Sequence, residues 1–147
     1  MPDHVTVRIA TYHDAGELAR LNALFNDVHD PPELVARRLQ DSRTIETPLL
    51  AEKDGKAVGF ASLLLIHSPF YEAPYAEITE LFVEAGVRRQ GVGRALMEKA
   101  EQLAHQRGTL EIRLVTSAEN QTAQAFYHSL GYKESREKVF EKITSSE

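Results

Sequence analysis

The sequence predicts a single α/β domain over residues 1–147, built on a mixed, mostly antiparallel twisted sheet with helices on both faces. An Asp54-Gly55 pair joins two apolar stretches, which favours an antiparallel hairpin. Further along, a strand-like run, a glycine-containing turn, a helical pattern and another strand-like run follow one another between residues 76 and 116. That order indicates a right-handed parallel crossover. A sheet that contains both connections is expected to bury its faces under helices.

The N-terminal part of the chain is expected to contribute one strand and two helices. Val5–Ile9 alternates apolar and polar residues, as in a strand with one buried face. Asp14 and Glu17 have the residue types of the N-cap and N3 positions of a capping box. The helix that begins there carries an apolar side made of Leu18, Leu21, Leu24 or Phe25, and Val28. A second helix is expected to start in the segment 30–33, where proline in the first turn costs no hydrogen bond.

The middle of the chain predicts a hairpin, an aromatic loop and a further strand. Thr47–Glu52 and Ala57–Ile66 flank the Asp54-Gly55 turn, so we expect them to pair as antiparallel neighbours. The loop 67–75 contains two prolines and three aromatic residues, and it either packs against the domain or faces the substrate. Ala76–Val83 then returns as a strand.

The C-terminal half predicts two helices and two more strands. Val92–Arg107 has apolar residues at helical spacing, which is typical of a helix with one buried face. Glu111–Thr116 alternates as a strand. The segment from Asn120, a suitable N-cap, to Gly131 is expected to be a helix. Glu137–Ile143 is expected to be a final strand.

Composition narrows the function. Hydrophobic residues make up 42% of the 147 residues, enough for a core, and the net charge of −5 argues against nucleic-acid binding. The chain has no cysteine, so neither a disulfide nor a thiolate nucleophile is expected. Its six histidines show no paired metal-ligand spacing, and no metal is expected. Because no apolar run approaches the length of a membrane span and no signal-peptide pattern is present, we expect a cytoplasmic protein without membrane attachment.

The segment 87–95 has the features of a phosphate-binding turn. It lies before an expected helix, whose first backbone N–H groups have no intrahelical acceptor and whose dipole favours an anion. Gly91 and Gly93 lack a Cβ atom, so an anion can approach the main chain. Three arginines add positive charge suited to phosphate, namely Arg88, Arg89 and Arg94.

This turn matches neither of two common nucleotide-binding motifs. A P-loop requires a Lys-Ser/Thr pair after its last glycine, where this chain has Arg94-Ala95. A dinucleotide-binding fingerprint requires a third small residue, and Leu96 occupies that position. The remaining alternative to phosphate binding is an arginine-rich turn that only begins a surface helix.

Two motifs resemble those of the GCN5-related N-acetyltransferase (GNAT) family. The segment 88–93 reads Arg-x-x-Gly-x-Gly between a strand and a helix, and it resembles the family's coenzyme A signature. The segment 120–132 reads Asn-x-x-Ala-x-x-Phe-Tyr-x-x-x-Gly-Tyr and resembles the family's last helical segment. Arg8, the two N-terminal helices and the order of elements also fit. The resemblance implies a GNAT-like fold with splayed central strands, in which the strand 76–83 diverges from the strand 111–116.

The resemblance also implies how acetyl-CoA binds. The pantetheine arm would pair with the main chain of the strand 76–83 where the sheet splays, and the amides of the following turn would hold the pyrophosphate. Asn120 is expected to hold the cofactor, to cap the last helix, or both. The other cofactor contacts are expected at Leu81, Phe82, Val83, Arg88, Arg89, Gln90, Gly91, Val92, Gly93, Arg94 and Tyr127.

In such enzymes a primary amine attacks the thioester directly, after a general base has taken its proton. The strand 76–83 offers Glu80 and, as the second choice, Glu77. In a regular strand these carboxylates face opposite sides of the sheet, and a bulge would change that. Each of them alternatively is solvated or clamps the substrate, with water relaying the proton. The resemblance further implies that Tyr127 protonates the leaving thiolate of coenzyme A.

The substrate class follows less directly. Glu72, Glu77 and Glu80 would form an acidic pocket suited to a small cationic amine such as a polyamine or an aminoglycoside. A protein N-terminus or lysine side chain is the alternative acceptor. A non-catalytic acetyl-CoA-binding module is the alternative of another class, and Tyr127 argues against it because a binder needs no acid. Family habit is compatible with a homodimer.

Overall fold

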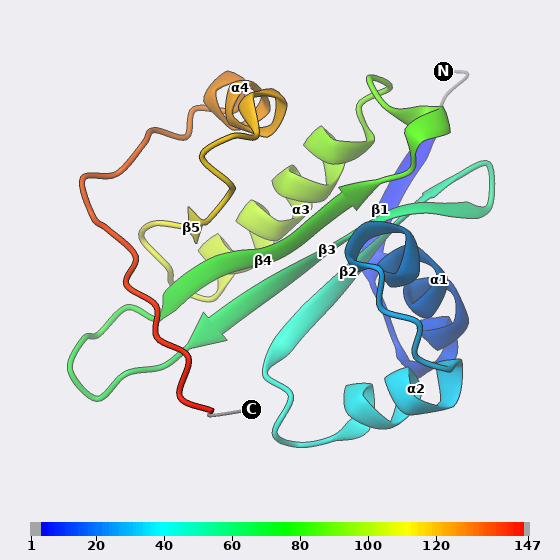
Figure 1. The fold of residues 1–147 in the computed structure, drawn as a ribbon, viewed down its shortest axis with the longest axis horizontal. Helices are drawn as coiled ribbons and strands as arrows, with labels where there is room; N and C mark the ends of the chain where they lie inside the picture. Colours follow the sequence, from blue (N-terminus) through cyan, green and yellow to red (C-terminus); the bar gives the residue numbers. More distant parts are fainter. Residues whose placement is uncertain (1–3, 146–147) are drawn as a thin grey trace. The chain divides into compact units, whose positions relative to one another are not determined.

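The computed structural model describes residues 4–145, and the chain divides into two units, residues 1–115 and 116–147. The first unit contains a five-stranded sheet and helices that pack on it (Figure 1). The strands are β1 (Val5–Ile9), β2 (Glu46–Lys53), β3 (Lys56–Ile66), β4 (Tyr75–Val83) and β5 (Arg113–Leu114). The helices are α1 (Ala15–Asn26), α2 (Pro32–Gln40) and α3 (Val92–Gln106), with short 3₁₀ turns η1 (Tyr12–Asp14) and η2 (Ala85–Val87).

The strands lie in the order β1-β2-β3-β4-β5. Neighbouring strands from β1 to β4 are antiparallel, and β4 and β5 are parallel. Asp54 and Gly55 form the turn between β2 and β3 with φ values of 52° and 79°, the left-handed pair that a two-residue hairpin requires. The mixed, mostly antiparallel sheet predicted from the sequence is therefore confirmed.

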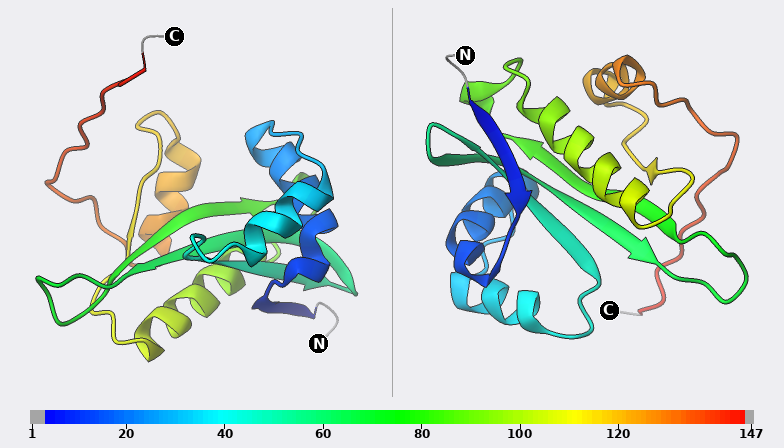
Figure 2. Two further views of the ribbon diagram at one scale, coloured as in Figure 1. Left: turned by 90° about the horizontal axis from the view of Figure 1, so that it is seen from below. Right: turned by 180° about the vertical axis from the view of Figure 1, so that it is seen from behind.

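Helices cover both faces of the sheet, as predicted. In the edge-on view of Figure 2, α1 and α2 lie on one side and α3 on the other. On the α1 side, Leu18 and Leu21 pack with Leu50 and Phe60 in one buried cluster. On the other side, α3 buries one face, which comprises Val92, Leu96, Met97, Ala100, Leu103 and Ala104. These two layers hold β3 and β4 in the middle of the unit.

A bulge interrupts β4 opposite the middle of β3. Ser62 pairs with Glu80, whereas the next residue of β3, Leu63, pairs with Ile78, so Thr79 is an extra residue. Thr79 donates its hydroxyl hydrogen to Glu46 of β2, which keeps the bulged residue attached to the sheet. Because of the bulge, the side chains between Glu77 and Glu80 no longer alternate regularly between the two faces of the sheet.

The sheet splays after the first residues of β4, as the family resemblance implies. Pairing between β4 and β5 is confined to Glu77 with Arg113 and Ile78 with Leu114. Among residues 4–145, the remainder of β4, up to Val83, has a strand partner only on the β3 side. The expected strand 111–116 is correspondingly too long, because ladder hydrogen bonds end where the two strands diverge.

Two other expectations are wrong. Asp14 precedes α1 but forms no side-chain cap on it; its carboxylate instead accepts from the Thr11 N–H at 2.8 Å and completes the capping box of η1. No strand forms at Glu137–Ile143. Alternation of apolar and polar residues predicts which side of a strand is buried, but a strand also needs a neighbouring strand with which to pair. The described part of the second unit contains only α4 (Gln121–Ser129) as a regular element, so it offers no such neighbour.

Candidate active site

The turn before α3 presents a row of backbone donors. Arg89 and Gly91 both have left-handed backbone conformations, with φ values of 64° and 84°, and Gly91 is the N-cap of α3. Within the described residues, none of the backbone N–H groups from Arg89 to Arg94 donates to a protein acceptor, and the first donor that does is that of Ala95, to Gly91 O at 3.0 Å. The chain therefore contains the anion cradle that the sequence predicted at a helix N-terminus.

The side chains of this turn are exposed, and three of them have partners. Arg88 donates from Nε to the Val83 carbonyl oxygen at 3.1 Å, which ties the turn to the end of β4. Gln90 accepts a hydrogen bond from Lys53 of the β2–β3 hairpin. Arg94 lies 3.5 Å from Glu98 in an i,i+4 ion pair. The first two contacts hold the turn in place, and its main-chain N–H groups keep no acceptor among the described residues.

The end of β4 has an open edge directly before this turn. The Glu84 N–H donates to Val58 O at 2.9 Å, so the hydrogen-bonded positions of β4 that face β3 are those of Glu84, Phe82 and Glu80. The main-chain groups of Leu81 and Val83 consequently point to the side where β5 has diverged. The Val83 carbonyl accepts from Arg88, and in the described part of the chain the N–H and C=O of Leu81 have no strand partner.

Phe82 differs from its two neighbours. Its main chain faces β3, and its ring stacks on Phe25 of α1 with centroids 5.2 Å apart. Phe82 therefore contributes to the packing between α1 and the sheet, and its part in cofactor binding stays a prediction.

The bulge places both candidate bases on one face of the sheet. Glu77 pairs with Leu64 and Glu80 with Ser62, and these two residues of β3 share a face. Glu80 lies where β4 has already lost its β5 partner, whereas Glu77 lies where the strands are still paired. Of the two carboxylates, that of Glu80 is the one beside the splayed segment.

Neutral donors surround these carboxylates. Glu80 accepts a hydrogen bond from Asn26 Nδ2 at 2.7 Å, and Glu77 accepts one from the Tyr75 hydroxyl at 2.5 Å. A third carboxylate on the same face, Glu46, accepts from the Ser62 hydroxyl at 2.7 Å. No ion pair involves any of the three among residues 4–145. Three carboxylates therefore gather on this face of the first unit, with Arg113 as a nearby cation, opposite Glu77 in the sheet and over the Tyr75 ring.

Sequence reasoning missed Glu46 and Asn26. Glu46 could have been suspected from Ser62, a polar residue in an otherwise apolar strand that needs a partner when buried. No sequence signal marks Asn26, because its contact depends on how α1 lies over β4. Glu72, predicted to join the acidic pocket, is exposed on the loop 67–75. Phe70 and Tyr71 of that loop are 83% and 77% exposed, so these two rings do not pack against the domain, whereas Tyr75 lies under Arg113 and contacts Glu77.

The second unit carries Asn120 and Tyr127. Asn120 caps α4, since its Oδ1 accepts from the Ala123 N–H at 3.0 Å. Tyr127 packs edge-on against Phe126 and Tyr132, with ring centroids 5.4 and 6.1 Å away. Burial raises the pKa of the Tyr127 phenol, which keeps it protonated at neutral pH.

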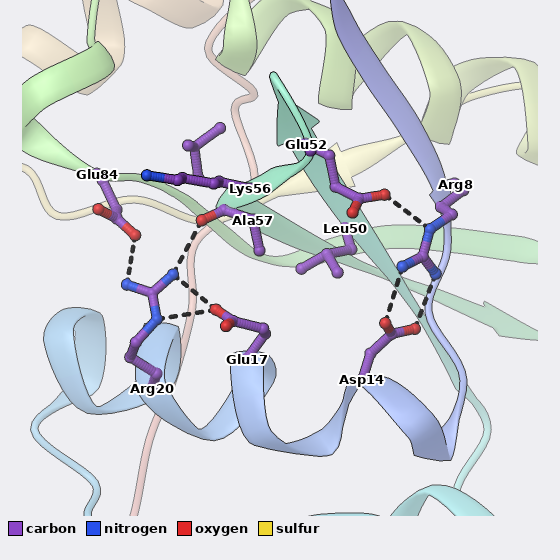
Figure 3. Close-up of a pocket in the computed structure, with 11 residues that line it drawn as sticks. Arg8, Asp14, Glu17, Arg20, Leu50, Glu52, Lys56, Ala57 and Glu84 are labelled. Atoms are coloured by element: carbon purple, nitrogen blue, oxygen red, sulfur yellow. Dashed lines mark hydrogen bonds and ion pairs between the residues drawn. The ribbon is translucent and has the colours of Figure 1, made fainter.

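A pocket of about 500 Å³ lies elsewhere in the first unit, between α1 and the β2–β3 hairpin (Figure 3). Arg8 bridges Asp14 and Glu52 in it, and Arg20 bridges Glu17 and Glu84. These charged side chains therefore pair with one another within the pocket. None of the candidate cofactor or catalytic residues lines the pocket.

No cluster of three or more histidine or acidic side chains in the described residues could hold a metal ion. None of the helices described is both long and apolar enough to cross a bilayer.

Several known proteins are similar to this chain in sequence. The model of the acetyltransferase (GNAT) family matches residues 15–132. The chain is 34% identical over 88 residues to N-acetyltransferase family 8 member 3 of Rattus norvegicus, a match that covers 60% of this chain and only 39% of the relative. It is 29% identical over 139 residues to an aminoglycoside N(6')-acetyltransferase type 1 of Stenotrophomonas maltophilia, with 92% and 90% covered.

Solved structures are also similar to this chain. An aminoglycoside N-acetyltransferase in complex with CoA superimposes with a TM-score of 0.82 at 22% identity. The match covers 99% of this chain and 98% of the other, which establishes a shared fold.

Proposed function

Because the chain belongs to the acetyltransferase (GNAT) family, we propose that it transfers the acetyl group of acetyl-CoA to the primary amine of a small cationic molecule. The observation that carries the proposal is the run of unpartnered N–H groups from Arg89 to Arg94, which directly follows the open edge of β4. A pyrophosphate needs such donors, and an extended amide-containing arm needs such an edge.

The residues present fit acetyl-CoA. The main chain from Arg89 to Arg94 would hold the pyrophosphate, with Arg88, Arg89 and Arg94 adding positive charge. Leu81 and the Val83 N–H would pair with the pantetheine amides, and Asn120, whose Nδ2 remains available beside its cap, would add a donor. When bound, acetyl-CoA supplies a thioester carbonyl that an amine can attack.

Glu80 is the proposed proton acceptor. Its carboxylate lies beside the splayed segment of β4, on the face where the amine would enter, and one of its oxygens is held by Asn26. Glu77 is the second choice, because it lies where β4 and β5 are still paired. Tyr127 is the proposed donor of a proton to the leaving thiolate. Its phenol carries the proton at neutral pH, since burial moves its pKa further up from an ordinary value that is already above neutral.

The acceptor is proposed to be cationic because of the acidic face. Glu46, Glu77 and Glu80 lie on one side of the sheet without ion pairs among residues 4–145. Such a surface raises the local concentration of ammonium groups. Relatives named aminoglycoside acetyltransferases support an amine of that kind.

An amine screen tests the proposal. Purified protein is mixed with acetyl-CoA and sisomicin, spermidine or a lysine-containing peptide, and release of the free thiol is followed. Release with sisomicin or spermidine supports the proposal. Release with the peptide alone shows a protein acceptor instead. Binding of CoA without release for any amine shows a binding module and contradicts the proposed activity.

A further inference from the structure

The last turn of α1 reaches Glu80 through one side chain. Asn26, the final residue of α1, donates from Nδ2 to Glu80 Oε1 at 2.7 Å. The same nitrogen donates to Asn22 Oδ1, one helical turn earlier, at 2.6 Å. Both hydrogens of the Asn26 amide are therefore used, one to fix the side chain on its own helix and one to hold the carboxylate.

The chemistry of these groups determines the orientation of the amide. An ionised carboxylate only accepts hydrogen bonds, so the nitrogen of Asn26 and not its oxygen must face Glu80. Oε1 accepts from Asn26, whereas the second oxygen, Oε2, has no donor among the described residues and can take a proton from a substrate. Beside this contact, Phe25 stacks on Phe82 at an interplanar angle of 25°, which fixes the distance between α1 and β4.

We infer that Asn26 is a positioning residue that orients the Glu80 carboxylate for proton removal from the amine. This inference rests on the proposed function and adds to it a residue on another element, far from the family motifs. A charge-assisted hydrogen bond of this length favours one orientation of the carboxylate, and proton transfer depends on such placement.

A role in folding alone does not account for the contact. Asn26 is exposed, and α1 ends immediately after it at Asp27, whose left-handed conformation with a φ of 55° terminates the helix independently of that side chain. The buried contacts of α1 come from Ala15, Leu18, Ala19 and Leu21, all N-terminal to Asn26. Removal of the Asn26 amide is therefore expected to leave the helix and its packing in place.

The test is a double-mutant cycle on kcat. Asn26→Leu replaces the amide with an apolar group of similar size, and Asn26→Asp keeps the shape but puts a second carboxylate beside Glu80. Each variant is made in the wild-type protein and in a Glu80→Gln background, with sisomicin or spermidine as the acceptor. Thermal unfolding and KM for acetyl-CoA are measured for each, and Leu24→Ala, an exposed change in the same turn, is the control.

We expect Asn26→Leu to lower kcat about tenfold, with KM for acetyl-CoA and the melting temperature unchanged. Asn26→Asp should lower kcat further. In the Glu80→Gln background neither change should have an additional effect, because there is no carboxylate left to orient. A wild-type kcat in Asn26→Leu, or an equal loss in both backgrounds, overturns the inference while the proposed function stands. Wild-type protein that acetylates neither amine overturns both.

Discussion

Glu77 and Glu80 lie on the same face of the sheet although three positions separate them. The reason is Thr79, the extra residue that lets Ser62 and Leu64 of β3 pair with the two glutamates. In a regular strand one of the carboxylates would point toward α3. The bulge thus places two candidate bases on one side of β4. They differ in their position along the strand, because Glu77 lies where β4 pairs with β5 and Glu80 lies beyond that pairing.

Replacement of each glutamate separates their roles. Glu80→Gln should lower kcat about 100-fold, the usual contribution of a general base, because the amide cannot take the proton of the ammonium. Glu77→Gln should change kcat less than about tenfold and act mainly on KM for the amine, since its carboxylate would attract the cation without accepting its proton. Steady-state kinetics with sisomicin measures both variants. A larger kcat loss in Glu77→Gln than in Glu80→Gln would make Glu77 the general base and Glu80 the group that attracts the amine.

The glycine of the anion cradle offers a second prediction. Gly91 has a φ of 84° and Gly86, nearby in η2, has no left-handed φ, while a Cβ at either position would meet nothing within 4 Å. Gly91→Ala therefore adds about 1 kcal/mol of backbone strain and no clash. A turn that relieves this strain by leaving the left-handed conformation misdirects its N–H groups, so up to about the same free energy, or about fivefold in affinity for coenzyme A, is expected to be lost. Gly86→Ala should leave the affinity unchanged. Isothermal titration with coenzyme A compares the two, and equal affinities would show that the turn does not hold the pyrophosphate.

Most of the fold could be predicted because its signals are local. Each of these signals spans a short stretch of sequence: the Asp54-Gly55 turn, the alternation in each strand and the spacing of apolar residues in α3. The expected strand Glu137–Ile143 does not form, because a strand also needs an edge to pair with, and no short stretch of sequence reports that. The length of β5 was overestimated for the same reason.

The candidate site likewise has features that could be predicted from the sequence and features that could not. The turn from Arg88 to Arg94 could be recognised because consecutive residues supply its N–H groups, its glycines and its charge. The contact of Asn26 with Glu80 could not, since it joins residues 54 positions apart through the docking of α1 on β4. The bulge at Thr79 is likewise invisible in the sequence, because an extra residue is defined only against the register of β3.

A third prediction concerns the ion pairs of the pocket next to α1. Arg8 lowers the pKa of Asp14 from 3.8 to about 2, mainly through their hydrogen bonds. A carboxyl whose pKa is lower in the folded state adds stability above its ordinary pKa, and loses it as the pH falls toward its folded value. The stability gap between wild type and Asp14→Asn should therefore be largest near pH 6 and shrink from pH 4 to pH 2. Urea unfolding at pH 6 and at pH 2 measures this difference in stability. A difference that stays constant with pH would contradict a lowered pKa of Asp14.

The last prediction concerns the proposed acid. Tyr127→Phe removes one hydroxyl and keeps the ring that packs against Phe126 and Tyr132, so α4 should fold as before. If Tyr127 protonates the leaving thiolate, the variant should lose kcat about 100-fold while its affinity for coenzyme A stays within about twofold. Tyr132→Phe removes a phenol from the neighbouring ring and should retain kcat. Turnover and coenzyme A titration are measured on both variants. Normal turnover by Tyr127→Phe with sisomicin and with spermidine would show that the thiolate takes its proton from another donor, such as water.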